Sequence, residues 1–152
     1  MTARTSWSRA QVAAATVATF AALVAGCGGP ANVGTVSGVV TLDGQPLPDA
    51  RVTFQPRQGA PSLGVTDASG RYELRYTRDR AGAVVGEHAV SISTFRAGRP
   101  DADPPVERRP ERVPPRYNRQ TELNATVARG ANQIDFSLDG SGKFAQPKPG
   151  DY

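Results

Sequence analysis

The sequence has little of what metal and thiol sites are built from. Its 152 residues include one cysteine, Cys27, and one histidine, His88. A single cysteine excludes an internal disulfide, and so few soft ligands argue against a zinc or thiol site. The turn glycines lie between predicted strands instead of opening a helix, which argues against a phosphate-binding loop. We therefore expect a domain that is not an enzyme and that folds without metal, cofactor or disulfide.

Negative charge is missing from the N-terminus. The stretch MTARTSWSRAQ carries Arg4 and Arg9 and no acid, and Ala10 to Gly26 carries no charge at all. A basic start, a short apolar run and small residues at its end are typical of a secretory signal peptide. A membrane-spanning helix usually needs about 20 strongly apolar residues. This shorter, alanine-rich run makes a permanent transmembrane helix the weaker interpretation.

The only cysteine ends this apolar run, in LVAGCGG, directly after Val24, Ala25 and Gly26. This pattern resembles the lipobox of bacterial lipoproteins. The resemblance implies that the thiol of Cys27 receives a diacylglycerol, that cleavage occurs before Cys27, and that the new amino group is acylated, with palmitate as the expected chain. Two or three chains hold a protein firmly on a bilayer, whereas one binds only marginally. The alternative is an ordinary signal peptide or signal anchor followed by a free thiol, which is a liability in an oxidising compartment.

The cleavage site and the composition of the segments after it divide the sequence into four parts. They are a signal peptide (1–26), a lipidated tether (27–33), one small domain (34–139) and a Gly- and Pro-rich tail (140–152) that we expect to be disordered. The domain is then anchored in the periplasm or at the cell surface. Gly28 is not the aspartate that some bacteria use to retain lipoproteins in the inner membrane, which slightly favours the outer membrane. Loss of the signal peptide removes two arginines and no acid. The remaining 16 basic and 14 acidic residues give a net charge of +2, which does not indicate a nucleic-acid-binding surface.

No stretch after Cys27 has a helical period, and alternating apolar residues predict strands instead. In GTVSGVVTL, for example, Val36, Val40 and Leu42 share one face. Seven such stretches, separated by turn residues, predict an all-β domain, a seven-stranded antiparallel β-sandwich. The residues predicted to be buried in its core are Val40, Val52, Phe54, Leu74, Val90, Ile92, Ile134 and Phe136. Tyr72 and Tyr76 are expected to point inward, and His88 to be a half-buried packing residue.

Three stretches, VSGVVTLDGQPLPDARVTFQP, GVTDASGRYEL and VGEHAVSIS, resemble the carboxypeptidase regulatory-like, or transthyretin-like, β-sandwich family. The resemblance covers about Thr35 to Ile92 and implies a prealbumin/Ig-like Greek key. Gly38 predicts a bulge or a close backbone approach, Asp43-Gly44 a hairpin turn, and Gly70 a positive φ. A related hydrolase of purine breakdown uses several histidines and a C-terminal Tyr-Arg-Gly-Ser motif, which this chain lacks. Neither its activity nor carboxypeptidase zinc chemistry is therefore implied.

Residues 96–111 combine prolines, arginines and acids without an apolar period, which predicts a long exposed connection in extended form. The arginines in and after it are Arg108, Arg109, Arg112, Arg116 and Arg119. They could contact anionic lipid headgroups or glycans, but a solvated loop with neighbouring acids, Glu111 among them, is the favoured interpretation. Tyr117, flanked by Arg116 and Arg119, is the best candidate for ligand contact, although packing against the sandwich edge is the commoner role of such a residue.

Two functions of different class stay open. The first is a lipid-anchored, non-catalytic structural or protein-interaction module of the cell envelope. The second is a carbohydrate-binding module at the same place. Sugar sites usually present exposed aromatic rings, yet the only tryptophan leaves with the signal peptide and two of the tyrosines point inward. This scarcity favours the first function. The expected partners are the membrane, through the lipid on Cys27, and an unidentified envelope protein or glycan, but no nucleic acid.

Overall fold

The computed structural model describes residues 32–142. The signal peptide, Cys27 and the lipobox residues Val24, Ala25 and Gly26 lie outside this range. The described chain forms β1 (Val33–Leu42), β2 (Gln45–Pro46), β3 (Arg51–Pro56), β4 (Ser62–Val65), β5 (Arg71–Glu73), β6 (Arg75–Thr77), β7 (Arg80–Ala81), β8 (Ala83–Val84), β9 (Gly86–Ser93), the 3-10 helix η1 (Pro115–Tyr117), β10 (Leu123–Val127), β11 (Ala131–Gln133) and β12 (Phe136–Leu138). The prediction of an all-β domain is confirmed.

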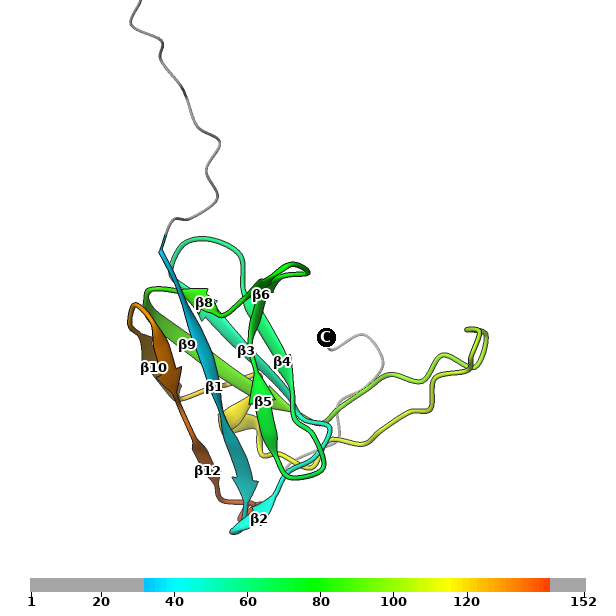
Figure 1. Ribbon diagram of the computed structural model, residues 1–152. Coiled ribbons are helices and arrows are strands. Elements are labelled where there is room, and N and C mark those ends of the chain that lie inside the picture. The colour runs from blue at the N-terminus through cyan, green and yellow to red at the C-terminus, as the bar shows by residue number, and fades with distance from the viewer. Residues whose placement is uncertain (1–31, 143–152) are drawn as a thin grey trace, which may run out of the picture.

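The strands form two sheets (Figure 1). In the first, β1 pairs with β2, β5 and β8 in antiparallel fashion and with β11 and β12 in parallel fashion. The second sheet is antiparallel, with the order β10-β9-β3-β4-β6-β7. The parallel pairs of β1 differ from the purely antiparallel arrangement expected, because the first and last strands of the domain run side by side in the same direction.

The described residues form twelve strand segments instead of seven, partly because two of the predicted strands are interrupted. One of them breaks between β11 and β12. Here the Asp135 carboxylate, and not a backbone carbonyl, accepts a hydrogen bond from the Val39 N–H at 2.8 Å. Ile134, at the same break, donates its N–H to the Ser37 carbonyl but is only partly buried. Its predicted place in the buried core is therefore wrong, since it packs at the margin.

The core lies between the two sheets and gives the domain a sandwich-like packing. Phe54 of β3 and Phe136 of β12 meet edge to face across it, with ring centroids 6.1 Å apart. The other residues predicted to form the core are buried: Val40, Val52, Leu74, Val90 and Ile92. Tyr72 is buried as expected, whereas Tyr76 is only half-buried. His88, expected to be half-buried, is only 2% exposed because its ring packs against Phe54.

Three turn and approach predictions are confirmed. A Cβ at Gly38 would collide with the backbone of Ile134, so only glycine lets β1 pass this close. Asp43 and Gly44 both have positive φ, at 52° and 78°, as a tight two-residue hairpin turn requires. Gly70 has a φ of 75° and ends the turn before β5.

The domain boundaries differ slightly from the expected 34–139. β1 already begins at Val33, the last residue assigned to the tether. After β12 the chain is held as far as Ser141: the Asp43 carboxylate accepts a 2.8 Å hydrogen bond from the Gly140 N–H. The described range, 32–142, contains no helix with the length and hydropathy of a membrane span.

Residues 96–109 leave the body as two extended stretches, which we call the arm (Figure 1). Arg96 bridges Arg109 and Arg99 bridges Val106 in antiparallel fashion. Reciprocal backbone hydrogen bonds of 2.8–3.1 Å hold both pairs. The arm is thus an irregular hairpin that projects from the sandwich.

Candidate functional site

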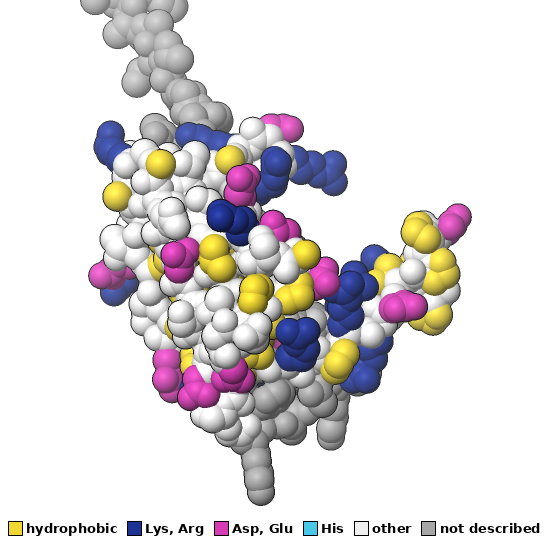
Figure 2. Space-filling model, turned by 60° about the horizontal axis from the view of Figure 1, so that its bottom comes forward, with side chains coloured by type: hydrophobic (Ala, Val, Ile, Leu, Met, Phe, Trp, Pro, Cys, Tyr) yellow, Lys and Arg dark blue, Asp and Glu magenta, His cyan; other side chains and the backbone are white. Residues whose placement is uncertain are grey.

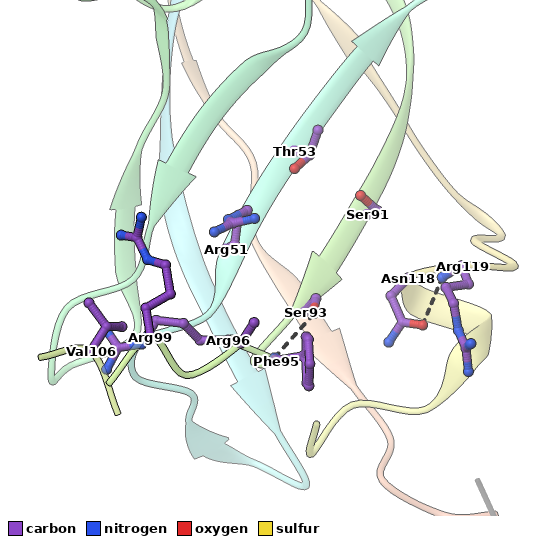
Figure 3. Close-up of a pocket in the computed structure, with 11 residues that line it drawn as sticks. Arg51, Thr53, Ser91, Ser93, Phe95, Arg96, Arg99, Val106, Asn118 and Arg119 are labelled. Carbon is purple, nitrogen blue, oxygen red and sulfur yellow. Dashed lines mark hydrogen bonds between the residues drawn. The ribbon is translucent and has the colours of Figure 1, made fainter. Parts of the chain in front are cut away.

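A groove of about 480 Å³ lies at the base of the arm. The second sheet forms its floor through Arg51 and Thr53 of β3 and Ser91 and Ser93 of β9. The arm forms one wall, and the segment around η1 forms the other. The lining residues on these walls are Phe95, Arg96, Ala97, Arg99, Val106, Asn118 and Arg119. In the view of Figure 3, Arg51 and Arg99 lie on one side and Arg119 on the other.

Strand alternation produces the floor of this groove. In β3, Val52 and Phe54 enter the core, so Arg51 and Thr53 must face outward. In β9, Val90 and Ile92 are buried, so Ser91 and Ser93 face the same way. The register places Arg51 opposite Ser93 and Thr53 opposite Ser91. The result is a small patch of hydroxyl groups beside a guanidinium group on the outer face of the sheet.

A buried carboxylate fixes the arm to this floor. Glu111 is 4% exposed, so the prediction that it is a solvated loop acid is wrong. Its Oε2 accepts a 2.5 Å hydrogen bond from the Ser93 hydroxyl. Its Oε1 accepts hydrogen bonds from the Thr94 N–H and hydroxyl, both at 2.9 Å, and from the N–H groups of Arg112 and Val113, at 3.0 and 3.1 Å. Glu111 therefore joins the end of β9 to the segment that leaves the arm.

Two opposing effects act on the pKa of Glu111. Burial raises it, because the charged form loses water, but the hydrogen bonds from Ser93, Thr94 and Val113 outweigh burial and hold the pKa below its usual value of 4.5. The side chain is thus an ionised acceptor at neutral pH. Removing it would leave buried N–H groups without their partner, which is costly. The shape of the groove therefore depends on a residue beneath it.

The groove is electrostatically positive and contains unused hydrogen-bond donors. Its lining includes four arginines and no carboxylate. Arg96 donates through Nε to the Glu107 carbonyl at 3.2 Å. Among residues 32–142, the guanidinium groups of Arg51 and Arg99 form no ion pair, whereas the neighbouring Arg109 pairs with Asp49 at 2.5 Å. Planar guanidinium groups bind carboxylate or phosphate oxygens in pairs, so the groove can bind an anion.

The three predicted ligand-contact residues do not form one site. Arg119 lies at the groove. Arg116 instead holds the end of the domain: it donates to the carbonyls of Asp139 and Ser141 at 2.6 and 3.0 Å. Its guanidinium also lies 4.9 Å from the centre of the Tyr117 ring, and that ring packs against the core. The packing role of Tyr117 is therefore the one observed.

His88 occupies a packing position. Its Nε2 lies 2.7 Å from the Val84 carbonyl and donates to it, because a carbonyl only accepts. Within the described range, Nδ1 is buried without a partner. The same range contains no group of three or more His, Cys, Asp or Glu side chains that could hold a metal ion.

Arg51, Arg99 and the hydroxyl floor were not predicted from the sequence. Alternation in RVTFQP already predicted that Arg51 and Thr53 face outward, but the register that sets them beside Ser93 and Ser91 depends on which strands pair. No local pattern marked Glu111, because a single acid among prolines and arginines looks like any exposed loop residue.

Comparisons with known proteins do not assign the chain to a family. No protein-family model matches the chain, and no curated protein matches it. Among solved structures, the chain is similar to a DUF3823 family protein from Parabacteroides merdae, with 14% sequence identity and a TM-score of 0.37. The match covers 70% of this chain and 46% of that one, so it spans less than half of that protein's length.

Proposed function

We propose that this chain is a bacterial lipoprotein, anchored through Cys27, whose domain is a non-catalytic protein-interaction module of the cell envelope. We assign the domain to the carboxypeptidase regulatory-like sandwiches with a prealbumin-type Greek key. The close approach at Gly38 and the turns at Asp43-Gly44 and Gly70 support this assignment, because they explain the residues on which the resemblance rests. The module binds an anionic partner in the groove.

The observation that carries the proposal is the position of the groove relative to the point where the chain enters the domain. Arg51 and Ser93 pair at one end of the β3–β9 ladder, and Pro56 and His88 at the other. His88 bonds to Val84, which pairs with Val33, so the chain enters the domain at the end opposite the groove. Five residues lie between Cys27 and Val33, and the six steps from one Cα to the next span at most about 20 Å. An anchored domain can thus present the groove away from the bilayer, which favours a partner within the envelope.

A glycan partner is the second candidate, and the floor of the groove is the observation that favours it. Thr53, Ser91 and Ser93 present hydroxyl groups next to guanidinium groups, a combination that suits acidic sugars. The packed ring of Tyr117 counts against it, because glycan sites usually expose aromatic rings.

Photo-crosslinking from the floor of the groove tests the proposal. A photoreactive residue at Thr53 of the full chain, expressed in its native host, should crosslink to a protein. The combined changes Arg51→Glu and Arg99→Glu should abolish the product. The same photoreactive residue at Arg80, on the far edge of the second sheet, is the control. Products that glycosidase removes would support the glycan instead, and equal products from Thr53 and Arg80 would contradict both.

A further inference from the structure

We infer that the partner of the groove is a second copy of this chain, with the tip of each arm bound in the groove of the other copy. The tip is defined as residues 100–105, PDADPP. This inference rests on the groove being the interaction surface proposed above, and it names the occupant. The result is an arm-exchanged dimer with two equivalent contacts.

The charges of the arm are segregated along its length. Asp101 and Asp103 are exposed at the tip, and neither forms an ion pair among the described residues. The base carries Arg96, Arg108 and Arg109 with one acid, Glu107, and Arg99 directly precedes the tip. Figure 2 shows acidic side chains toward the end of the projecting arm and basic side chains where it joins the body. An arm that is positive at its base and negative at its tip is complementary to an antiparallel copy of itself.

The proline-rich composition of the tip also favours binding in a groove. It contains three prolines and an alanine, Pro100, Ala102, Pro104 and Pro105, and all but Ala102 are exposed. Proline restricts the backbone before binding, which lowers the entropy lost when the tip is fixed in a groove. The groove offers Phe95, Ala97 and Val106 as apolar contacts beside its arginines. An acidic, proline-rich tip matches both parts of this lining.

The dimensions allow this exchange and oppose the intramolecular alternative. Asp103 lies seven positions after Arg96, and at about 3.3 Å per position the arm reaches roughly 23 Å. Two antiparallel arms of this length place each tip beside the base of the other, where the groove lies. The Arg99–Val106 bridge, with hydrogen bonds of 2.8 and 2.9 Å, keeps the two stretches of the arm paired, and the paired arm carries its tip outward from the body (Figure 1). Each copy gives and receives the same contact, as a two-fold dimer requires.

Sedimentation of the full chain, purified from native membranes in nonionic detergent, tests the dimer. The wild type should dimerise at low salt and dissociate in 1 M salt, because screening weakens exposed ion pairs. A groove-reversed variant (Arg51→Glu, Arg99→Glu) and a tip-reversed variant (Asp101→Arg, Asp103→Arg) should each raise the dissociation constant at least tenfold. An equimolar mixture of the two should form heterodimers, because each acidic tip then meets a basic groove and each basic tip an acidic groove.

Arg78→Glu with Arg80→Glu is the matched control, since it makes the same change in net charge at exposed positions outside the groove. It should dimerise like the wild type. A wild type that stays monomeric, or a mixture that fails to associate, would overturn the exchange. The crosslinking result separates this outcome from failure of the proposed function: products with another protein that depend on Arg51 and Arg99 would leave the groove as the interaction surface.

Discussion

Loss of the Glu111 carboxylate should destabilise the domain and open the base of the arm. In Glu111→Ala, the N–H groups of Thr94 and Val113, both buried residues, lose their acceptor, whereas the Arg112 N–H keeps the Thr94 hydroxyl as an acceptor at 2.8 Å. An unsatisfied buried donor costs about 1–3 kcal/mol, so we expect a loss of about 3–5 kcal/mol. At about 4 °C per kcal/mol for a domain of this size, the melting temperature should fall by roughly 12–20 °C.

Glu111→Gln separates charge from shape. Its amide oxygen can still accept hydrogen bonds, but the charge-assisted part is lost, so we expect a cost of about 1–3 kcal/mol at pH 7. Because the folded-state pKa of Glu111 lies below its usual value of 4.5, the carboxylate stabilises the fold above that value. This stabilisation is lost as the pH falls through the folded-state pKa. The stability difference between wild type and Glu111→Gln should therefore shrink between pH 5 and pH 3.

Thermal melts of residues 32–142, followed by circular dichroism at pH 7, 5, 4 and 3, provide the measurement. Glu107→Gln is the control, because Glu107 is an exposed acid on the same segment. Asp67 and Asp139 also have lowered pKa values, but they are present in every variant and cancel in the difference. If Glu111→Ala melted like Glu107→Gln, the buried carboxylate would not hold the base of the arm.

Other predictions address the core and the expected lack of metal. Phe54→Ala and Phe136→Ala should each lower the free energy of unfolding by about 3–5 kcal/mol through lost burial and a cavity. If both variants melted at the wild-type temperature, the assigned core would be wrong. His88→Ala should cost about 2–4 kcal/mol, because it loses packing against Phe54 and the hydrogen bond to Val84, while circular dichroism stays of β type. Gly38→Ala should cost about 1–3 kcal/mol by collision with the backbone of Ile134, and equal denaturant midpoints would refute the close approach. EDTA and reductant should leave the melting curve unchanged, and unfolding by EDTA would reveal an unrecognised metal site.

The sequence predicted the parts of the fold that local pattern determines. Alternation placed Val52 and Phe54 inward, and turn chemistry predicted the hairpin turn at Asp43-Gly44 and the positive φ of Gly70. Pairing across long sequence separations was not predictable in the same way. The parallel contact of β1 with β11 and β12 joins residues almost a hundred positions apart. Within it, the Asp135 carboxylate takes the place of a backbone carbonyl as the acceptor for the Val39 N–H.

The groove was not predictable from the sequence for the same reason. Its floor combines two strands and its walls come from the arm and η1, so no single stretch of sequence contains it. Glu111 was misassigned because its burial depends on Ser93 and Thr94, 18 and 17 residues earlier in the chain. Arg116 and Tyr117 were candidates for ligand contact because they are charged and aromatic, and in the structure both also contact the C-terminal end of the domain.

The most direct test of the proposed function is the mass of the protein isolated from its native host. Anchoring through Cys27 predicts a chain that begins at Cys27, lacks residues 1–26, and carries the added mass of a diacylglycerol and an acyl group. Cys27→Ser should then leave an uncleaved or unanchored species. A native protein with a free, unmodified Cys27 thiol would contradict the account, whatever the groove binds.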